Sequence, residues 1–384
     1  MTVHILTGDC RQLLRTLPEK SVHCCVTSPP YWGLRDYGVG GQIGLEGTYP
    51  EYVSALVDVF REVKRVLRDD GTLWLNLGDC YATGAGRVGD CPGGGVQGSM
   101  WAGRPAPGKT QGAGYRGTRG KLNSGKAALR IASVGPATQP NRMPQAGLKP
   151  KDLVGIPWRV AFALQEEGWW LRRDIIWHKA NPMPESVQDR PTTSHEYIFL
   201  LSKSERYFYD AEAIMEPSSP DSHARAKRGR SQTHKWADGG PGGQTIARLP
   251  PSAGRLPGVN PKADYPSTGG PRSKQNASFS AAISGDVAPM RNKRSVWTVA
   301  SEPFSDAHFA TFPTALIEPC ILAGTQSGEV IIDPFGGAGT TGLVADRLGR
   351  DAILIELNPE YAAMAERRIK GDAGMFVDVR RAAE

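Results

Sequence analysis

The chain has 384 residues, 39% of them hydrophobic, and it contains 46 glycines and 30 prolines. This length suits one large α/β domain with insertions, or two domains, and the apolar share is enough for one sizeable core. No run of about 18 apolar residues occurs, and the N-terminus lacks the basic and apolar blocks of a signal peptide. The composition therefore argues against a membrane partner and predicts a cytoplasmic protein.

The net charge of +7 is distributed unevenly. Residues 83–147 carry nine Lys or Arg and one acid, residues 211–294 carry thirteen and six, and the remainder has a net charge of −8. Both basic segments are rich in Gly and Pro and have little apolar periodicity, so we expect two insertions in a mildly acidic body. Such insertions suit contact with nucleic-acid phosphates, or they are merely solvated loops.

Apolar patterning predicts strands that alternate with helices. In chain order the predicted strands are 3–7, 21–27, 72–77, 170–177, 196–202, 329–333 and 351–356, and the predicted helices are 11–17, 49–68, 153–167, 309–323, 338–348 and 358–370. This alternation calls for a mostly parallel sheet of seven strands with helices on both faces. The strands 170–177 and 196–202 are typical of a terminal hairpin of such a sheet.

One strand, Val22 to Thr27, runs directly into Ser28-Pro29-Pro30-Tyr31. Two prolines cannot continue a central strand, so these residues form a loop at its carboxyl end, where open α/β sheets build their sites. Prolines also offer carbonyls without competing N–H groups. Taken alone, the segment could equally be an ordinary proline-rich turn.

A second loop, with Gly336, Gly337 and Gly339, joins the strand 329–333 to a helix. The glycines let the backbone approach a ligand closely, and the helix N-terminus offers free N–H donors. Its G-x-G-x-x-G pattern, with Glu356 nineteen residues after Gly337, also fits the dinucleotide fingerprint of nicotinamide or flavin enzymes. That fingerprint usually belongs to an N-terminal βαβ unit, which disfavours an oxidoreductase.

Together the two loops resemble the signatures of one enzyme family. Thr27-Ser28-Pro29-Pro30-Tyr31-Trp32 resembles the catalytic motif of the N6-adenine/N4-cytosine DNA methyltransferases, and the segment from Asp333 to Gly342 resembles their S-adenosylmethionine (AdoMet) loop. Because the catalytic motif comes first, the chain resembles the circularly permuted, beta-type branch. The resemblance covers roughly 1–82, 148–210 and 297–370, and it implies a Rossmann-like methyltransferase fold in which strand 3–7 succeeds strand 351–356.

The resemblance implies that Ser28 Oγ and the Pro29 carbonyl accept hydrogen bonds from the exocyclic amine of a flipped base, on which Tyr31 stacks. Glu356 would accept hydrogen bonds from the ribose of AdoMet, and neither a metal nor a covalent intermediate is expected. The implied catalytic residues are Ser28, Pro29, Pro30 and Tyr31, and the implied cofactor-binding residues are Asp9, Cys10, Phe312, Asp333, Pro334, Phe335, Gly336, Gly337, Gly339, Thr340, Thr341 and Glu356.

The chain divides accordingly into a catalytic half and a cofactor half. The expected segments are 1–82 with the catalytic motif, 83–147 as a flexible basic insertion, 148–210 as the remainder of the catalytic half, 211–296 as a basic region for target recognition or DNA contact, and 297–384 as the AdoMet-binding half. Segments around Lys179 and Glu196 resemble the target-base side of the family's cleft. His195 and Glu196 are neighbours on a strand and point to opposite faces, which favours a structural role for both.

Two features of the sequence bear on the reaction. In this family an initial Ser goes mostly with cytosine N4 and an initial Asp mostly with adenine N6, so Ser28 favours cytosine, with adenine as the alternative. The implied partner is double-stranded DNA, in a restriction–modification setting with a cognate endonuclease, and the enzyme would be a monomer or homodimer. A catalytically silent DNA-binding module and an RNA- or protein-directed amino-methyltransferase stay open, although neither motif looks damaged.

Overall fold

The structure, a computed structural model, describes residues 1–82, 147–218, 290–302, 311–373 and 378–382. The chain divides into two compact units, Met1–Ala213 with Arg294–Glu384, and Ile214–Lys293. Almost all of the insertion predicted at 83–147, and most of the basic region predicted at 211–296, lie outside the described residues.

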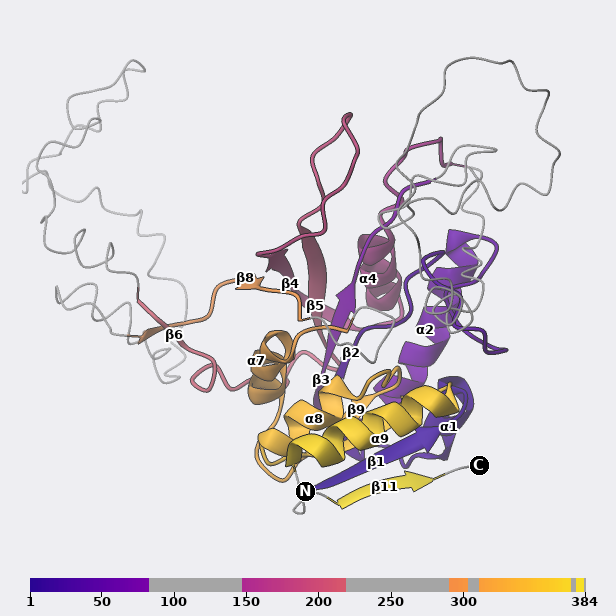
Figure 1. Ribbon diagram of the computed structural model, residues 1–384. Coiled ribbons are helices and arrows are strands. Elements are labelled where there is room, and N and C mark those ends of the chain that lie inside the picture. Colours follow the sequence, from indigo (N-terminus) through magenta and orange to yellow (C-terminus); the bar gives the residue numbers. More distant parts are fainter. Residues whose placement is uncertain (83–146, 219–289, 303–310, 374–377, 383–384) are drawn as a thin grey trace, which may run out of the picture. The chain divides into compact units, whose positions relative to one another are not determined.

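The first unit is built on a nine-stranded sheet with the strand order β11-β1-β10-β9-β2-β3-β5-β4-β8 (Figure 1). The strands are β1 Thr2–Thr7, β2 Val22–Thr27, β3 Leu67–Leu77, β4 Trp170–Lys179, β5 His195–Ser202, β8 Val296–Val299, β9 Val330–Asp333, β10 Asp351–Glu356 and β11 Asp378–Ala382. All neighbouring pairs are parallel except those that β5 makes with β3 and β4. The predicted Rossmann-like, mostly parallel sheet is confirmed, and so is its terminal hairpin.

The predicted number of seven strands was too low, because one further strand extends the sheet at each edge. β8 adds to β4, and β11 adds to β1. Asp378–Ala382 contains three charged residues among its five and Val296–Val299 has only four residues, so neither shows the apolar run that marks a buried strand. The seven predicted strands lie consecutively between these two.

The position of β1 explains the permuted order of the motifs. β1 lies beside β10 in parallel register, with Val3 opposite Ala352 and Thr7 opposite Glu356. The first strand of the chain is therefore the spatial neighbour of the last predicted strand–helix unit, as the permutation predicts. Because β1, β10, β9, β2 and β3 are parallel, the residues that follow them meet at one edge of the sheet.

Helices cover both faces of this sheet. They are α1 Cys10–Thr16, α2 Tyr49–Val66, α4 Ile156–Glu166, α7 Thr314–Gly324, α8 Thr340–Arg347 and α9 Pro359–Ala373. α2 contacts α1 and α4. On the other face, α8 contacts α7 and α9, and these three helices lie on the near side in Figure 1. Successive side chains of β2 point to opposite faces of the sheet. Cys25 packs in the core together with α1, α2 and α4, whereas Cys24 faces Gly324 of α7.

The longest helix, α2, shows how the sequence specifies these elements. Thr48 caps its N-terminus and exchanges hydrogen bonds with Glu51 in a capping box. Its buried residues include Leu56, Val59 and Val63, the apolar face expected from their helical spacing. α7 begins at Thr314, later than predicted, and the preceding residues 303–310 lie outside the described part.

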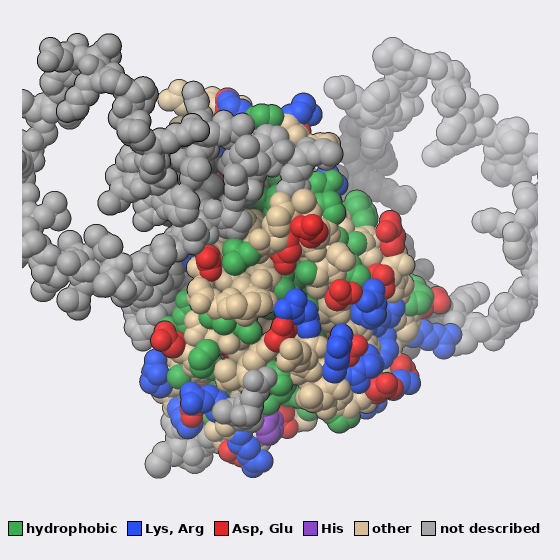
Figure 2. Space-filling view, turned by 90° about the vertical axis from the view of Figure 1, so that its right-hand side faces the viewer, with side chains coloured by type: hydrophobic (Ala, Val, Ile, Leu, Met, Phe, Trp, Pro, Cys, Tyr) green, Lys and Arg blue, Asp and Glu red, His purple; other side chains and the backbone are tan. Residues whose placement is uncertain are grey.

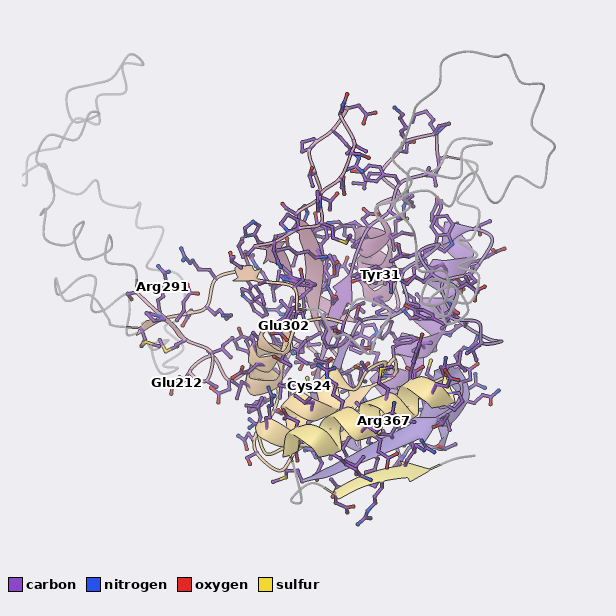
Figure 3. All side chains as sticks on the ribbon, in the orientation of Figure 1. Cys24, Tyr31, Glu212, Arg291, Glu302 and Arg367 are labelled. Atoms are coloured by element: carbon purple, nitrogen blue, oxygen red, sulfur yellow. The ribbon has the colours of Figure 1, made fainter. Side chains whose placement is uncertain are left out.

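In the second unit, the described residues form a short antiparallel pair, β6 Glu216–Pro217 and β7 Met290–Arg291. Glu216 and Arg291 form an ion pair across these two strands at 2.9 Å, and Arg291 is labelled in Figure 3.

One face of the protein is mixed in charge. On the face shown in Figure 2, Lys and Arg side chains are interspersed with Asp and Glu. Within the described ranges, no helix combines the length and the apolar character needed to cross a bilayer.

Candidate active site

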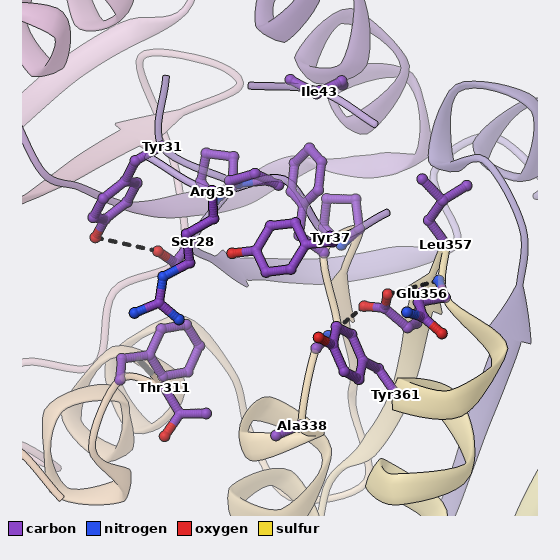
Figure 4. Close-up of a pocket in the computed structure, with 18 of the residues that line it drawn as sticks. Ser28, Tyr31, Arg35, Tyr37, Ile43, Thr311, Ala338, Glu356, Leu357 and Tyr361 are labelled. Carbon is purple, nitrogen blue, oxygen red and sulfur yellow. Dashed lines mark hydrogen bonds between the residues drawn. The ribbon is translucent and has the colours of Figure 1, made fainter. Parts of the chain in front are cut away.

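A cavity of about 330 Å³ opens at the edge of the sheet where the parallel strands end. It is lined by the loops after β1, β2, β9 and β10, and by side chains from β3, β4 and β5. Figure 4 shows Ser28 and Tyr31 at one end, Glu356 and Tyr361 at the other, and Tyr37 between them. The two loops that resemble the methyltransferase motifs therefore share one cavity.

Most of the site residues expected from the sequence lie in the wall of this cavity. They are Asp9, Cys10, Ser28, Pro29, Pro30, Tyr31, Phe312, Pro334, Phe335, Gly336, Gly337, Thr340 and Glu356. Three others, Asp333, Gly339 and Thr341, are not part of the wall.

Asp333 organises the glycine loop from behind. Its side chain accepts hydrogen bonds from Thr27 Oγ1 at 2.6 Å, Thr341 Oγ1 at 2.7 Å and the Phe335 N–H at 3.0 Å. Burial raises the pKa of this carboxyl to about 6, although the three donors oppose the rise. Asp333 thus ties β9 to β2 and α8, and it is not among the residues that line the cavity.

Gly339 lets α8 begin close to α9. Its φ is +77°, and a Cβ at this position would lie 2.8 Å from the Cβ of Ala365. Only glycine satisfies both the turn and the close approach of the two helices. The first N–H groups of α8, beginning at Thr340, have no partner within the helix, and Thr340 lines the cavity.

Glu356 faces the cavity from the end of β10. Its Oε2 accepts a hydrogen bond from the Gly337 N–H at 2.7 Å, and its Oε1 accepts one from the Asn358 N–H at 2.8 Å. Burial raises the pKa of this carboxyl, and the two backbone donors oppose the rise. A carboxylate can accept about four hydrogen bonds, so both oxygens retain acceptor capacity for hydroxyl groups.

Asp9 and Cys10 form the wall beside the end of β1. The Asp9 carboxylate accepts a hydrogen bond from the Arg11 N–H at 2.8 Å, which caps α1, and pairs with the Arg11 guanidinium at 2.5 Å. Burial alone would raise the pKa of Asp9, but Arg11 lowers it overall. Burial raises the pKa of the Cys10 thiol to about 12, so this side chain is an uncharged neighbour of the cavity.

Two tyrosines that the sequence had not singled out complete the cofactor end. Tyr37 and Tyr361 both line the cavity near Glu356, and their rings meet edge to face with centroids 6.1 Å apart (Figure 4). Tyr361 follows the end of β10 by one short turn of α9, a position that marks it as a candidate once the strand order is known.

At the other end, the serine–proline loop presents oxygen acceptors to the cavity. Tyr52 donates a hydrogen bond to the Pro30 carbonyl at 2.9 Å, which occupies that oxygen and fixes the loop. The Pro29 carbonyl accepts no hydrogen bond from any residue in the described part of the chain. Ser28 Oγ makes one long contact, of 3.5 Å, with Tyr31. Ser28 and Pro29 are thus the acceptors available here.

Tyr31 is held in one place by several contacts. Tyr31 is labelled in Figure 3. Its hydroxyl lies 2.7 Å from Glu196 Oε2 and 3.1 Å from Asn76 Oδ1. Burial, and then the charge of Glu196, raise the phenol pKa well above its usual value, so Tyr31 is a neutral donor. Its ring packs on Gly78, where a Cβ would lie 2.5 Å from the ring.

Asn76, Lys179 and Glu196 form the remaining polar wall at this end. The expected structural role for Glu196 rested on its alternation with His195, and the structure places Glu196 in the cavity wall while His195 is exposed. One signal could have identified Asn76, since it is a buried polar residue within the otherwise apolar end of β3. Among the described residues, no group of three or more His, Cys, Asp or Glu is placed to hold a metal ion.

Comparison with known proteins identifies the family. Residues 22–367 match a family model described as DNA methylase. The chain is 41% identical over 368 residues to the type II methyltransferase M.Cfr9I of Citrobacter freundii, a match that covers 96% of this chain and 88% of that protein. It is 42% identical over 367 residues to the type II methyltransferase M.XycI of Xanthomonas campestris pv. cyanopsidis, with 96% and 87% covered.

A solved structure of the PvuII cytosine-N4-specific DNA methyltransferase aligns with 98% of this chain and 96% of its own, at 18% identity and a TM-score of 0.48. The family match confirms the recognition made from the two motifs, and with it AdoMet as the methyl donor. The chain belongs to the DNA methylase family of N6- and N4-methyltransferases.

Proposed function

We propose that this DNA methylase transfers a methyl group from AdoMet to N4 of a cytosine flipped out of double-stranded DNA. The observation that carries the proposal is the shared cavity, in which Ser28 and Pro29 offer free acceptors opposite the glycine loop. A serine at the first position of the catalytic motif favours cytosine. The relatives M.Cfr9I and M.XycI are named type II methyltransferases, and we extend the type II restriction–modification setting to this chain.

Activation of the amine is the chemical task of the serine–proline loop. The exocyclic amine of cytosine is a weak nucleophile because its lone pair is delocalised into the ring. Ser28 Oγ and the Pro29 carbonyl accept hydrogen bonds from its two N–H groups and draw the lone pair out of conjugation. The fixed φ of the two prolines, and the hydrogen bond from Tyr52 to Pro30, hold these acceptors in place.

The opposite end of the cavity has the groups that AdoMet requires. The two oxygens of Glu356 suit the ribose hydroxyls, and the first N–H groups of α8 suit the carboxylate of the methionine part. Phe335 and Ile355 supply apolar walls. Bound AdoMet supplies a methyl group activated on a sulfonium sulfur. The residues of the cavity align it with the amine, and such positioning supplies much of the acceleration of a displacement.

We assign DNA contact to the basic segments 83–147 and 211–296. Their net charges are +8 and +7, whereas the remainder has a net charge of −8. Phosphate contacts release counterions, so deletion of residues 211–294 should lower the affinity for DNA and flatten its dependence on salt. An unchanged salt slope in the deletion variant would contradict this assignment.

The test of the reaction is nucleoside mass spectrometry on DNA from a methylation-free host that expresses the chain. A host that expresses the Ser28→Ala variant is the matched control. N4-methylcytosine above that control supports the proposal. N6-methyladenine instead would show that the target is adenine, and the absence of any methylated base would overturn the proposed reaction.

A further inference from the structure

An enclosed ion pair lies in the wall at the base end of the cavity. Lys179 Nζ and Glu196 Oε1 are 2.5 Å apart, and the two side chains are 25% and 14% exposed. The other oxygen of Glu196 accepts the hydrogen bond from Tyr31. The pair therefore stands next to the Tyr31 hydroxyl, which Ser28 Oγ contacts at 3.5 Å, and it has no part in the activation of the amine described above.

The ammonium group of Lys179 is held in a fixed position. It lies 4.7 Å from the centroid of the Trp177 ring, and the Trp177 indole donates a hydrogen bond to the Val299 carbonyl of β8 at 2.9 Å. The backbone N–H of Lys179 donates to the Ser194 carbonyl at 2.8 Å, which closes the end of the β4–β5 hairpin. A lysine ammonium has three N–H donors, and Glu196 takes one of them.

Glu196 accepts a third hydrogen bond, from Asn76 Nδ2 at 3.2 Å, so each of its oxygens has a partner. Its role is to fix Lys179 and Tyr31 relative to each other. An exposed lysine, Lys151, provides a contrast within the chain. Lys151 pairs with Asp189 at 2.6 Å, but those side chains are 78% and 56% exposed and lie outside the cavity wall.

We propose that Lys179 reads the flipped base by donating a hydrogen bond to the O2 carbonyl of cytosine, with Glu196 as its positioning residue. The inference rests on the proposed cytosine-N4 activity and deepens it. In cytosine, O2 lies across the ring nitrogen N3 from the amine. In adenine, with its amine in the same place, the corresponding atom is C2–H, which accepts no hydrogen bond.

Selection follows from this difference. A flipped base is read along its Watson–Crick edge, and a site built to donate to a carbonyl rejects a base that lacks it, because the donor then loses its partner. Ser28 and Pro29 contact the exocyclic amine, which cytosine and adenine both have. Lys179 therefore adds, at the position of O2, a discrimination between the two bases to the preference that Ser28 indicates.

The test compares two target bases in the recognition sequence, which is located first by sequencing methylated host DNA. One duplex carries cytosine. The other carries a 2-aminopyridine C-nucleoside, which keeps the amine and the ring nitrogen and has C–H in place of the O2 carbonyl. Single-turnover methylation is measured at saturating AdoMet, at a pH where the ring nitrogen of the analogue is neutral, for the unmodified protein and for Lys179→Met and Lys151→Met.

A hydrogen bond from a charged donor predicts that the unmodified protein prefers cytosine by about 10- to 100-fold. Lys179→Met should methylate both bases at one similar, reduced rate, whereas Lys151→Met should keep the preference. Equal rates on the two bases in the unmodified protein would overturn the inference without any variant. A preference for cytosine that persists in the Lys179→Met variant would also overturn the inference, because a purely structural ion pair would leave the preference unchanged.

The failure of this inference is distinguishable from the failure of the proposed function. If the nucleoside analysis finds N4-methylcytosine but the analogue is methylated as fast as cytosine, only the role of Lys179 is lost. If the analysis finds N6-methyladenine, both are lost, because adenine has no carbonyl at the position that Lys179 would read.

Discussion

The loops after β2 and β9 occupy equivalent places and are built in opposite ways. The two strands are parallel neighbours, and each runs into its loop at the same edge of the sheet. In the loop after β9, the carboxyl of Asp333 is buried, accepts three hydrogen bonds and does not line the cavity. In the loop after β2, Ser28 and Pro29 line the cavity and keep acceptors available.

The difference separates the residues that hold the site together, here called the frame, from the residues that act in the reaction. Thr27 and Ser28 are adjacent, yet Thr27 donates its hydroxyl to Asp333 of the other loop while Ser28 faces the cavity. Thr27, which directly precedes Ser28, therefore belongs to the frame of the cofactor half. Substitutions on the two loops should consequently affect different measurements, and the largest effect is expected in the frame.

Asp333→Ala should damage the frame most. It leaves the hydroxyls of Thr27 and Thr341 and the N–H of Phe335 without their acceptor in a buried place. We expect a loss of about 3 to 5 kcal/mol in the free energy of unfolding, as for other disrupted buried networks. Denaturant unfolding measures this loss, and calorimetry should show that AdoMet affinity falls with it. Unimpaired AdoMet binding in a fully folded variant would contradict the assignment of Asp333 to the frame.

Ser28→Ala should affect the reaction and leave the frame intact. Removal of one preorganised hydrogen-bonding group that acts in a transition state typically lowers kcat by about 10²- to 10³-fold. AdoMet affinity and the free energy of unfolding should change little, because Ser28 makes only the long contact with Tyr31. Parallel single-turnover and calorimetric measurements test the separation. If cofactor affinity collapsed together with kcat, the contrast between the two loops would be lost.

The sequence was sufficient for the frame of the fold and for the two loops. Buried parallel strands show continuous apolar runs, so the strands of the central sheet, and the loops that follow β2 and β9, were predicted from local pattern alone. β11 was not predicted, because a charged edge strand such as Asp378–Ala382 has no apolar pattern of its own and forms only by pairing with β1.

The division of labour within the site could not be predicted in the same way. Asp333 and Glu356 are both acids at the end of a parallel strand, but only the packing of Thr27 and Thr341 around Asp333 turns it away from the cavity. Likewise, Glu196 and Lys179 come together only through the antiparallel pairing of β4 and β5. Side-chain partners from distant segments decide these roles, and motif spacing does not record them.

The buried carboxyl of Asp333 also gives the frame a pH dependence. Its pKa of about 6 in the folded protein lies above the ordinary value of 3.8, so the folded state holds the proton more tightly than the unfolded state does. The contribution of this group to stability is therefore full below the ordinary value and is lost as the pH rises through about 6. A shift of this size corresponds to about 3 kcal/mol.

The Asp333→Asn variant isolates that contribution. An amide can still accept from Thr27 and the Phe335 N–H, and it does not ionise. The stability of the variant relative to the unmodified protein should therefore rise between pH 4 and pH 7, by a few kcal/mol at most. Urea unfolding of both proteins across this range measures the difference. A difference that stays constant with pH would show that Asp333 is ionised at no cost inside the frame.

The smallest effect should come from Gly78→Ala, which disturbs the catalytic loop indirectly. A Cβ at Gly78 would lie 2.5 Å from the Tyr31 ring, and Gly78 has no positive φ, so the clash with the ring is the only expected strain. Overpacking of this kind costs about 1 to 3 kcal/mol. Because the Tyr31 hydroxyl would then be displaced from Glu196, we expect methylation to fall about 10- to 100-fold while AdoMet affinity is unchanged. Gly371→Ala is the matched control, since a Cβ at Gly371 meets nothing within 4 Å. If both variants behaved like the unmodified protein, the ring of Tyr31 would be free to move, and the catalytic loop would be less fixed than the contacts of Tyr31 indicate.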